Sequence, residues 1–246
     1  MNDRLAAEAH AEKPAAPVKI IDSRSNAWSD LALTLPIFLA YHLGVVFLNM
    51  RNAADLVTAE LVRLADNHIM VYWGLTLAVG LSFVLVLSVL GRGQVFDSSR
   101  FVLIAVEGGL YAVLMRAAGA YVVGSLPLVA GQSITPFGGV VMSLGAGFYE
   151  ELAFRVGLFG VGVLGIRMFL GGILKFSAVV IWAVIAAAVF SGWHYVGVYG
   201  DAWNVRTFVF RLVCGLVFTA IYVFRGFAPA VWTHALYDIW VLTLSG

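Results

Sequence analysis

The chain has 246 residues, of which 61% are hydrophobic and 12% are charged, and its formal net charge is +1. Soluble domains carry about twice that share of charged residues, so the composition excludes an ordinary soluble domain and is typical of a protein with several membrane spans. The length leaves no room for a sizeable soluble domain beside the membrane domain, and the near-neutral charge gives no sign of a nucleic-acid partner.

The first residues differ from the rest of the chain. Residues 1–27 are polar, contain Ala and Pro and carry charges of both signs. They lack the apolar core and the small-residue cleavage site of a signal peptide, so we predict a flexible polar tail followed by a single transmembrane domain over residues 28–246. Cys214 is the only cysteine and lies in an apolar run, which excludes an intrachain disulfide and a thiolate metal cluster.

Seven apolar stretches are long enough to cross a bilayer and together predict an all-α membrane bundle. They cover residues 29–50, 69–91, 101–123, 137–165, 173–195, 206–224 and 227–245. Residues 53–66 are different, because charged residues interrupt their loosely helical apolar pattern. An interfacial helix, or a continuation of the second span, fits them better than a separate crossing, although an eighth crossing stays open.

Lys and Arg residues outside the spans predict the orientation in the membrane. When the N-terminus is placed in the cytoplasm, most of these residues fall in inner segments. Besides those of the tail, they are Arg92, Arg100, Arg167, Lys175 and Arg225. The bias predicts a cytoplasmic N-terminus and, with seven spans, an external C-terminus.

Several ionisable side chains lie inside the predicted spans, where a charge at the bilayer centre costs at least about 2.5–3.5 kcal/mol. They are Glu107, Arg116, Glu150, Glu151, Arg155, His194, Arg211, His234 and Asp238, together with His42. Three spans each hold a pair of residues four positions apart, which places the two side chains on one helix face. We expect these three faces to converge on one polar cavity, because convergence satisfies the buried polar groups together.

The first pair lies in GAGFYEELAFRVGLFG, residues 145–160, where Glu151 and Arg155 can form an ion pair. Glu150 is rotated by about 100° from Glu151 on an α-helix and has no such local partner. An ion pair that only holds helices together would therefore explain Glu151 and Arg155 but not Glu150.

The other two pairs each contain a histidine. FSGWH places Phe190 and His194 on one face, and HALYD does the same for His234 and Asp238. Either histidine alone could be a satisfied hydrogen-bonding group. Together with a glutamate, however, one histidine can help to remove a proton from water, and a second histidine beside a carboxylate can stabilise an oxyanion. Two histidines and a glutamate are also a possible zinc set.

The order EExxxR, FxxxH and HxxxD, with each motif on an apolar helix, resembles the CAAX protease and bacteriocin-processing (CPBP) family of intramembrane endopeptidases. The resemblance covers residues 137–245. It implies that Glu150 activates water with assistance from His194, and that Glu151 and Arg155 pair to shape the motif helix.

The resemblance further implies that His234 and Asp238 stabilise the oxyanion. The CAAX-processing eukaryotic members typically have Asn where this chain has Asp238. An ionised Asp accepts hydrogen bonds but donates none, so we expect Asp238 to orient His234 or to favour its protonated form.

Cofactor and substrate follow from the resemblance only in outline. The family's mechanism is either a metal-free, glutamate-activated water or a zinc site, here held by Glu150, His194 and His234. The chain has no HExxH pair, and we favour the metal-free version. The short, Ala-, Val- and Gly-rich chain indicates a bacterial member in the inner membrane. The expected partners are the lipid bilayer and a membrane-associated protein or peptide, cut in a C-terminal sorting or CAAX-like segment.

Two other functions remain open at this point. A family member that no longer cleaves could act as a binding or immunity scaffold, although all the motif residues are present. A proton-coupled transporter also uses intramembrane Glu, His and Asp, but its repeats should give matching halves, and the sequence shows none. Glu107 and Arg116 belong to no motif and face nearly opposite sides of their helix. We expect a structural role for His42, snorkelling for Arg211 and packing for Cys214.

Overall fold

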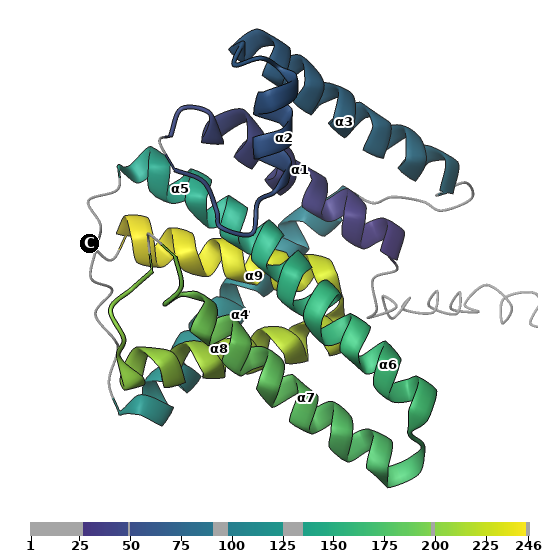
Figure 1. The fold of residues 1–246 in the computed structure, drawn as a ribbon, viewed down its shortest axis with the longest axis vertical. Helices are drawn as coiled ribbons and strands as arrows, with labels where there is room; N and C mark the ends of the chain where they lie inside the picture. Colours follow the sequence, from purple (N-terminus) through teal and green to yellow (C-terminus); the bar gives the residue numbers. More distant parts are fainter. Residues whose placement is uncertain (1–26, 49, 91–97, 125–134, 198–199, 245–246) are drawn as a thin grey trace, which may run out of the picture.

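The computed structural model describes residues 27–48, 50–90, 98–124, 135–197 and 200–244, and these residues form helices and connections without any strand (Figure 1). The predicted all-α class is therefore confirmed. The expected flexible tail lies, except for Ala27, outside the described residues.

The α-helices are α1 (Ala27–Val45), α2 (Val57–Leu64), α3 (Ile69–Leu90), α4 (Ser99–Val123), α5 (Pro136–Gly145), α6 (Val161–Phe169), α7 (Gly172–Trp193), α8 (Val205–Arg225) and α9 (Phe227–Ile239). Three further segments are π-helical, namely η1 (Ala146–Glu150), η2 (Leu152–Gly160) and η3 (Trp240–Leu244). Because α5, η1, η2 and α6 follow one another with little interruption, they form one long helix over Pro136–Phe169.

Each of the seven predicted spans is largely helical. Within the described parts of the chain, six helices are long and apolar enough to cross a membrane: Trp28–Val45, Ile69–Val89, Ser99–Val123, Pro136–Phe169, Gly172–Trp193 and Val205–Arg225. The seventh stretch is α9 continued by η3. α9 itself has only 13 residues and falls short of that length.

Residues 53–66 contain the separate short helix α2, which has 8 residues. At 1.5 Å per residue it is about 12 Å long, too short to cross a bilayer. Asp66 and Asn67 have positive φ angles of 49° and 61°, and they interrupt the helical conformation between α2 and α3. The structure thus supports a separate short helix and does not support a continuation of the second span.

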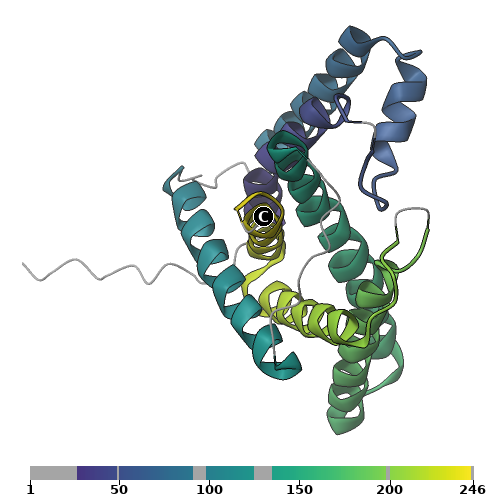
Figure 2. The same ribbon diagram turned by 90° about the vertical axis from the view of Figure 1, so that its left-hand side faces the viewer.

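α9 lies at the centre of the bundle and packs against α1, α4, α5, η1 and α8 (Figures 1 and 2). Small residues allow this close packing, as is common between membrane helices. Ala228 and Ala230 of α9 are fully buried, and a side chain on Gly108 of α4 would lie 3.1 Å from the backbone nitrogen of Thr233. The helix that bears the third motif is therefore enclosed on several sides.

The start of α9 is fixed by a residue that is distant in sequence. Gly226 has a φ angle of 109°, which favours glycine and allows the sharp turn between α8 and α9. The buried carboxylate of Asp30 in α1 accepts hydrogen bonds from the backbone N–H groups of Phe227 (3.0 Å) and Ala228 (3.2 Å). An acidic cap suits a helix N-terminus, because the first N–H groups lack partners and carry partial positive charge.

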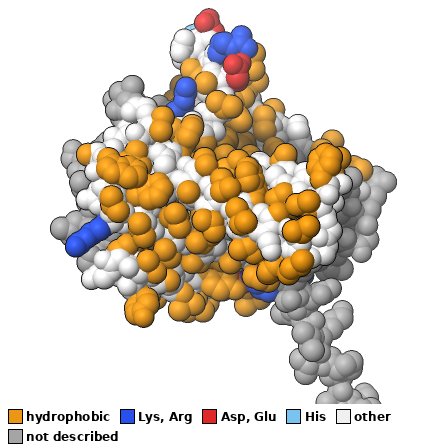
Figure 3. All heavy atoms as spheres, turned by 60° about the horizontal axis from the view of Figure 1, so that its bottom comes forward, with side chains coloured by type: hydrophobic (Ala, Val, Ile, Leu, Met, Phe, Trp, Pro, Cys, Tyr) orange, Lys and Arg blue, Asp and Glu red, His pale blue; other side chains and the backbone are white. Residues whose placement is uncertain are grey.

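The outer surface suits a lipid environment. Hydrophobic side chains cover most of the face shown in Figure 3, and the few charged side chains lie toward its edges. Large apolar side chains of the outer helices are exposed, such as Leu81 of α3 (68%) and Ile173 of α7 (74%). Extended apolar surface of this kind is unfavourable in water and favourable in lipid.

Three charged residues that lie inside the spans but outside the motifs have partners. Glu107 forms an ion pair with Arg225 at the end of α8, with an Nε–Oε1 distance of 2.5 Å. Arg116 lies over the ring of Trp240 at 4.9 Å. Arg211, which we expected to snorkel, forms an ion pair with Asp201 in the connection before α8. Cys214 is buried in a cluster of aromatic side chains, in agreement with a packing role.

Candidate active site

The first motif lies in the π-helical part of the long helix Pro136–Phe169. Glu150 ends η1 and Glu151 precedes η2, so the motif is not part of the regular α-helix that the sequence analysis assumed. π-Helical turns inside α-helices occur frequently at functional sites. The helix still places Glu151 and Arg155 side by side, and it turns Glu150 toward other partners.

Glu151 and Arg155 form the expected ion pair deep inside the bundle. Arg155 Nε lies 3.0 Å from Glu151 Oε2, and the two side chains are 1% and 0% exposed. The guanidinium also lies over the rings of Phe190 (4.3 Å) and Phe218 (5.0 Å), and its Nη2 donates to the carbonyl oxygen of Gly215 at 3.4 Å. Aromatic faces attract cations, so these rings add to the stabilisation of the buried charge.

Glu151 has a second contact that the sequence analysis did not anticipate. Its Oε1 accepts a hydrogen bond from Nδ1 of His234 at 2.7 Å, which joins the first motif to the third. The expected contact between His234 and Asp238 is present but longer, with 3.6 Å between Nε2 and Oδ2. Glu151 therefore orients the His234 ring through Nδ1, and Asp238 lies at the opposite ring nitrogen.

His194 is oriented by its own helix. Its Nδ1 lies 3.0 Å from the carbonyl oxygen of Phe190, so Nδ1 carries the proton and Nε2 points away from the helix. The Phe190 ring packs edge-on against His194 at 5.1 Å and against His234 at 6.0 Å between centroids. Because the same ring lies under Arg155, Phe190 packs against residues of all three motifs.

The three motifs meet at Glu150. Its Oε2 lies 3.9 Å from Nε2 of His194 and 3.9 Å from Nε2 of His234. This oxygen is buried and has no hydrogen-bond partner within the described part of the chain. The predicted convergence of the polar side chains on one place is therefore present in the structure.

A cavity of about 460 Å³ opens beside the two histidines. His194, His234 and Asp238 line it, together with apolar and aromatic side chains such as Phe210 and Tyr237. Glu150 lies behind the histidines, with its side chain 10% exposed. A substrate in this cavity would contact the two histidines directly. Glu150, which does not line the cavity, would be separated from the substrate by them.

Residues 132–240 match the sequence model of the family described as type II CAAX prenyl endopeptidase Rce1-like. This segment matches the CAAX protease family. The resemblance inferred from the three motifs is thereby confirmed, and the match together with the six apolar helices indicates an integral membrane protein. No curated protein and no solved structure matches the chain.

The CAAX protease resemblance raises the question of zinc at Glu150, His194 and His234. Both histidines donate from Nδ1 to an acceptor, as zinc-bound histidines commonly do, and this leaves Nε2 on the side of Glu150. Bond lengths of about 2.0–2.2 Å would place tetrahedral zinc ligands about 3.3–3.6 Å apart, and the two separations of 3.9 Å from Glu150 Oε2 are wider than that. Within the described residues, no group of three or more His, Cys, Asp or Glu side chains could hold a metal ion.

Asn52 is a site residue that the sequence analysis missed. Its Nδ2 donates a hydrogen bond to Glu150 Oε1 at 2.8 Å. Asn52 lies in the connection between α1 and α2 and belongs to no motif, so spacing along a helix gave no signal for it. The only sequence indication was a polar residue close to the end of an apolar span.

Gly147 lets the motif helix approach α9. A Cβ on Gly147 would lie 2.8 Å from the carbonyl oxygen of Val231 and 2.9 Å from the backbone nitrogen of Ala235. We expect Gly147→Ala to lower stability by about 1–3 kcal/mol, because backbone atoms cannot move aside as a flexible side chain can. Thermal unfolding in detergent measures this, and Gly109→Ala, which meets nothing within 4 Å, is the control. Equal melting temperatures for the two variants would contradict the expectation.

Proposed function

We propose that the protein is an intramembrane endopeptidase that hydrolyses a peptide bond of a membrane-associated substrate with a water activated by Glu150. The observation that supports this most directly is the position of Glu150 Oε2 beside the cavity. This oxygen lies 3.9 Å from Nε2 of His194 and 3.9 Å from Nε2 of His234. Such separations are too long for direct hydrogen bonds and suit a bridging water.

In the proposed mechanism, Glu150 acts as the general base. Its Oε2 takes a proton from the water while Nε2 of His194 accepts a hydrogen bond from the other water proton. The water oxygen then attacks the carbonyl carbon of the scissile bond, and the carbonyl oxygen becomes the oxyanion of a tetrahedral intermediate. The hydrogen bond from His194 Nδ1 to Phe190 keeps the Nε2 lone pair aimed at the water.

His234 is the proposed donor to the oxyanion. Carboxylates flank both of its ring nitrogens, Glu151 at Nδ1 and Asp238 at Nε2. This arrangement suits an imidazolium, which donates from both nitrogens, whereas the ionised Asp238 cannot itself donate. When the intermediate collapses, the C–N bond breaks, and the proton held by Glu150 passes to the leaving amine.

The proposed substrate is a C-terminal sorting or CAAX-like segment of a membrane-associated protein or peptide. The mainly apolar lining of the cavity and the match to the CAAX prenyl endopeptidase family support this class. We also propose a bacterial inner membrane location and a cytoplasmic N-terminus, on the basis of composition and the distribution of Lys and Arg.

Comparing membrane peptides from cells that express the wild type or Glu150→Ala tests the proposed function. Peptides that end at a new C-terminus should appear only with the wild type, and the purified wild type should produce the same ends in liposomes. Identical peptide sets, with both proteins folded and inserted, would refute the protease proposal. That result would favour a scaffold that binds without cleaving.

We expect proteolysis to survive removal of metal. The 3.9 Å separations exceed those of zinc ligands, and a carboxylate with a histidine can activate water directly. The measurement is cleavage of fluorogenic C-a-a-X peptides, with and without a prenyl group, before and after a strong chelator, alongside metal analysis of the same sample. About one zinc per chain, lost with activity on chelation and restored with it, would overturn the metal-free mechanism.

A further inference from the structure

Asn52 connects the N-terminal helices to the candidate active site. Its side chain is buried, with 6% of the residue exposed, and its Nδ2 donates to Glu150 Oε1. None of the three motifs includes Asn52, and the family match begins at residue 132, well after it. The hydrogen bond spans 98 positions in the sequence and is the contact that ties the connection after α1 to Glu150.

The orientation of the Asn52 amide is fixed by its other hydrogen bonds. Oδ1 accepts from the backbone N–H of Ala54 at 2.9 Å, so the NH₂ group must point the other way, toward Glu150. The backbone N–H of Asn52 donates to the hydroxyl oxygen of Tyr41 at 3.2 Å, and its carbonyl oxygen accepts from the backbone N–H of Asp55 at 3.0 Å. The residue is thus held at both ends of its backbone and at its side chain.

A buried polar network holds the Asn52 connection in place. Tyr41 donates to Asp55 Oδ2 at 2.7 Å, and the backbone N–H of Thr58 in α2 donates to Asp55 Oδ1 at 2.9 Å. Tyr41 and Asp55 are 0% and 1% exposed, so each partner satisfies a group that would otherwise be buried and unpaired.

The network also reaches the motif helix itself. The fully buried His42 of α1 bonds Tyr72 of α3 through Nδ1 at 3.0 Å and Tyr149 through Nε2 at 2.5 Å. Tyr149 directly precedes Glu150 in η1. The structural role expected for His42 is therefore to join α1, α3 and the motif helix next to the catalytic glutamate.

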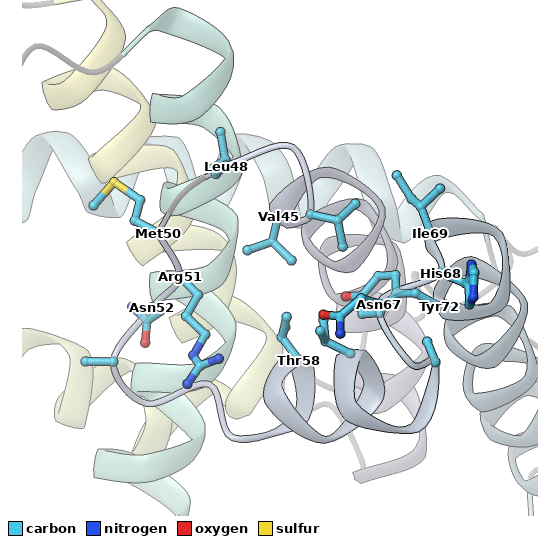
Figure 4. A pocket seen from close by; sticks show the side chains of 14 residues that line it. Val45, Leu48, Met50, Arg51, Asn52, Thr58, Asn67, His68, Ile69 and Tyr72 are labelled. Atoms are coloured by element: carbon cyan, nitrogen blue, oxygen red, sulfur yellow. The ribbon is translucent and has the colours of Figure 1, made fainter.

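Hydrogen bonds are important here because packing is incomplete on one side. A pocket of about 660 Å³ borders the connection, with Asn52 at one end and His68 and Ile69 at the other (Figure 4). Thr58 and Tyr72 also line this pocket. Because the described side chains leave this side of the connection open, the position of Asn52 depends more on its polar contacts.

We propose that Asn52 is a positioning residue that sets which oxygen of Glu150 acts as the base, an inference that rests on the proposed protease function. The Asn52 amide engages Oε1, and this leaves Oε2 facing His194 and His234. Without the amide, the carboxylate is free to rotate away from the histidines. A small displacement of a reacting group lowers the rate of the chemical step more than it lowers substrate binding.

The first test compares Asn52→Asp with Thr58→Val. Asp keeps the shape and the contact with Ala54 but presents an oxygen instead of an NH₂ group to Glu150. Val removes the hydroxyl contacts of Thr58 with Asp55 and His42 in the same network without touching Glu150. With fluorogenic C-a-a-X peptides in liposomes, we expect Asn52→Asp to lower kcat by about 10–100-fold with KM within about twofold, and Thr58→Val to leave kcat within about threefold.

Two outcomes of this assay would overturn the proposal. Equal losses of kcat in both variants would show that kcat depends on the connection between α1 and α2 as a whole and not on the contact of Asn52 with Glu150. A raised KM with unchanged kcat for Asn52→Asp would place Asn52 in substrate binding instead.

The second test does not depend on catalysis. We expect Asn52→Ala to lower the melting temperature in detergent. In the Glu150→Ala background the same change should lower it much less, because the hydrogen bond between Asn52 and Glu150 is already absent there. Equal shifts in the two backgrounds would overturn the proposal. If the shifts differ while the wild type cleaves no peptide, Asn52 still positions Glu150 and the protease function is what fails.

Discussion

Replacing Glu150 by Gln is expected to lower the rate of proteolysis by about 10²–10⁴-fold while the protein still folds and inserts. Gln keeps the shape of the side chain, and its carbonyl oxygen can still accept the hydrogen bond from Asn52. The change removes the carboxylate that is proposed to take the proton from water. The NH₂ group of Gln would take the place of Oε2 and face the Nε2 atom of His194, which can accept a hydrogen bond.

Cleavage of fluorogenic C-a-a-X peptides by reconstituted protein measures this loss. The matched control is Glu107→Gln, which also neutralises a carboxylate within a span but affects contacts away from the motifs, namely those with Arg225 and Tyr111. We expect Glu107→Gln to keep its turnover, and both variants to show cooperative thermal unfolding. Near-normal turnover of Glu150→Gln would remove Glu150 from the mechanism.

Contacts within one helix could be predicted from the sequence. Glu151 with Arg155, Phe190 with His194, and His234 with Asp238 are each four residues apart, and helix geometry alone places them together. The cost of placing charges in lipid gave the further prediction that these faces converge, and the helices do bring them together.

Contacts between distant segments could not be predicted in the same way. Three contacts depend on how the helices pack. They are the hydrogen bond from Asn52 to Glu150, the hydrogen bond from His234 to Glu151, and the ion pair of Glu107 with Arg225. No periodicity records such packing. Helix geometry also failed locally, because the π-helical turns around Glu150 change the direction of side chains within the first motif.

Glu151 shows how a correct pairing can still be incomplete. Its pairing with Arg155 explained one carboxylate oxygen, and the second oxygen was left without a partner in the sequence analysis. In the structure that oxygen orients His234, so Glu151 links a buried cation to the proposed oxyanion donor. A change at Arg155 should therefore reach the site through Glu151.

Arg155→Ala is expected to destabilise the protein by about 3–5 kcal/mol, the usual result of breaking a buried ion pair by removing one partner. The change leaves the carboxylate of Glu151 buried with only His234 beside it, and it empties the space over the rings of Phe190 and Phe218. Thermal or denaturant unfolding in detergent measures the loss. Because the whole bundle is affected, activity should fall together with the folded fraction.

The double variant Glu151→Gln with Arg155→Met separates the ion pair from simple loss of volume. Met refills the space over the two rings and makes favourable sulfur–aromatic contacts. Gln is neutral, and its carbonyl oxygen can still accept from His234 Nδ1, so no unpaired charge stays buried. Replacing both members of a buried pair is often neutral or stabilising, and we expect the double variant to recover part of the stability that Arg155→Ala loses. A double variant less stable than Arg155→Ala alone would show that the charge of Glu151 is needed for more than its pairing with Arg155.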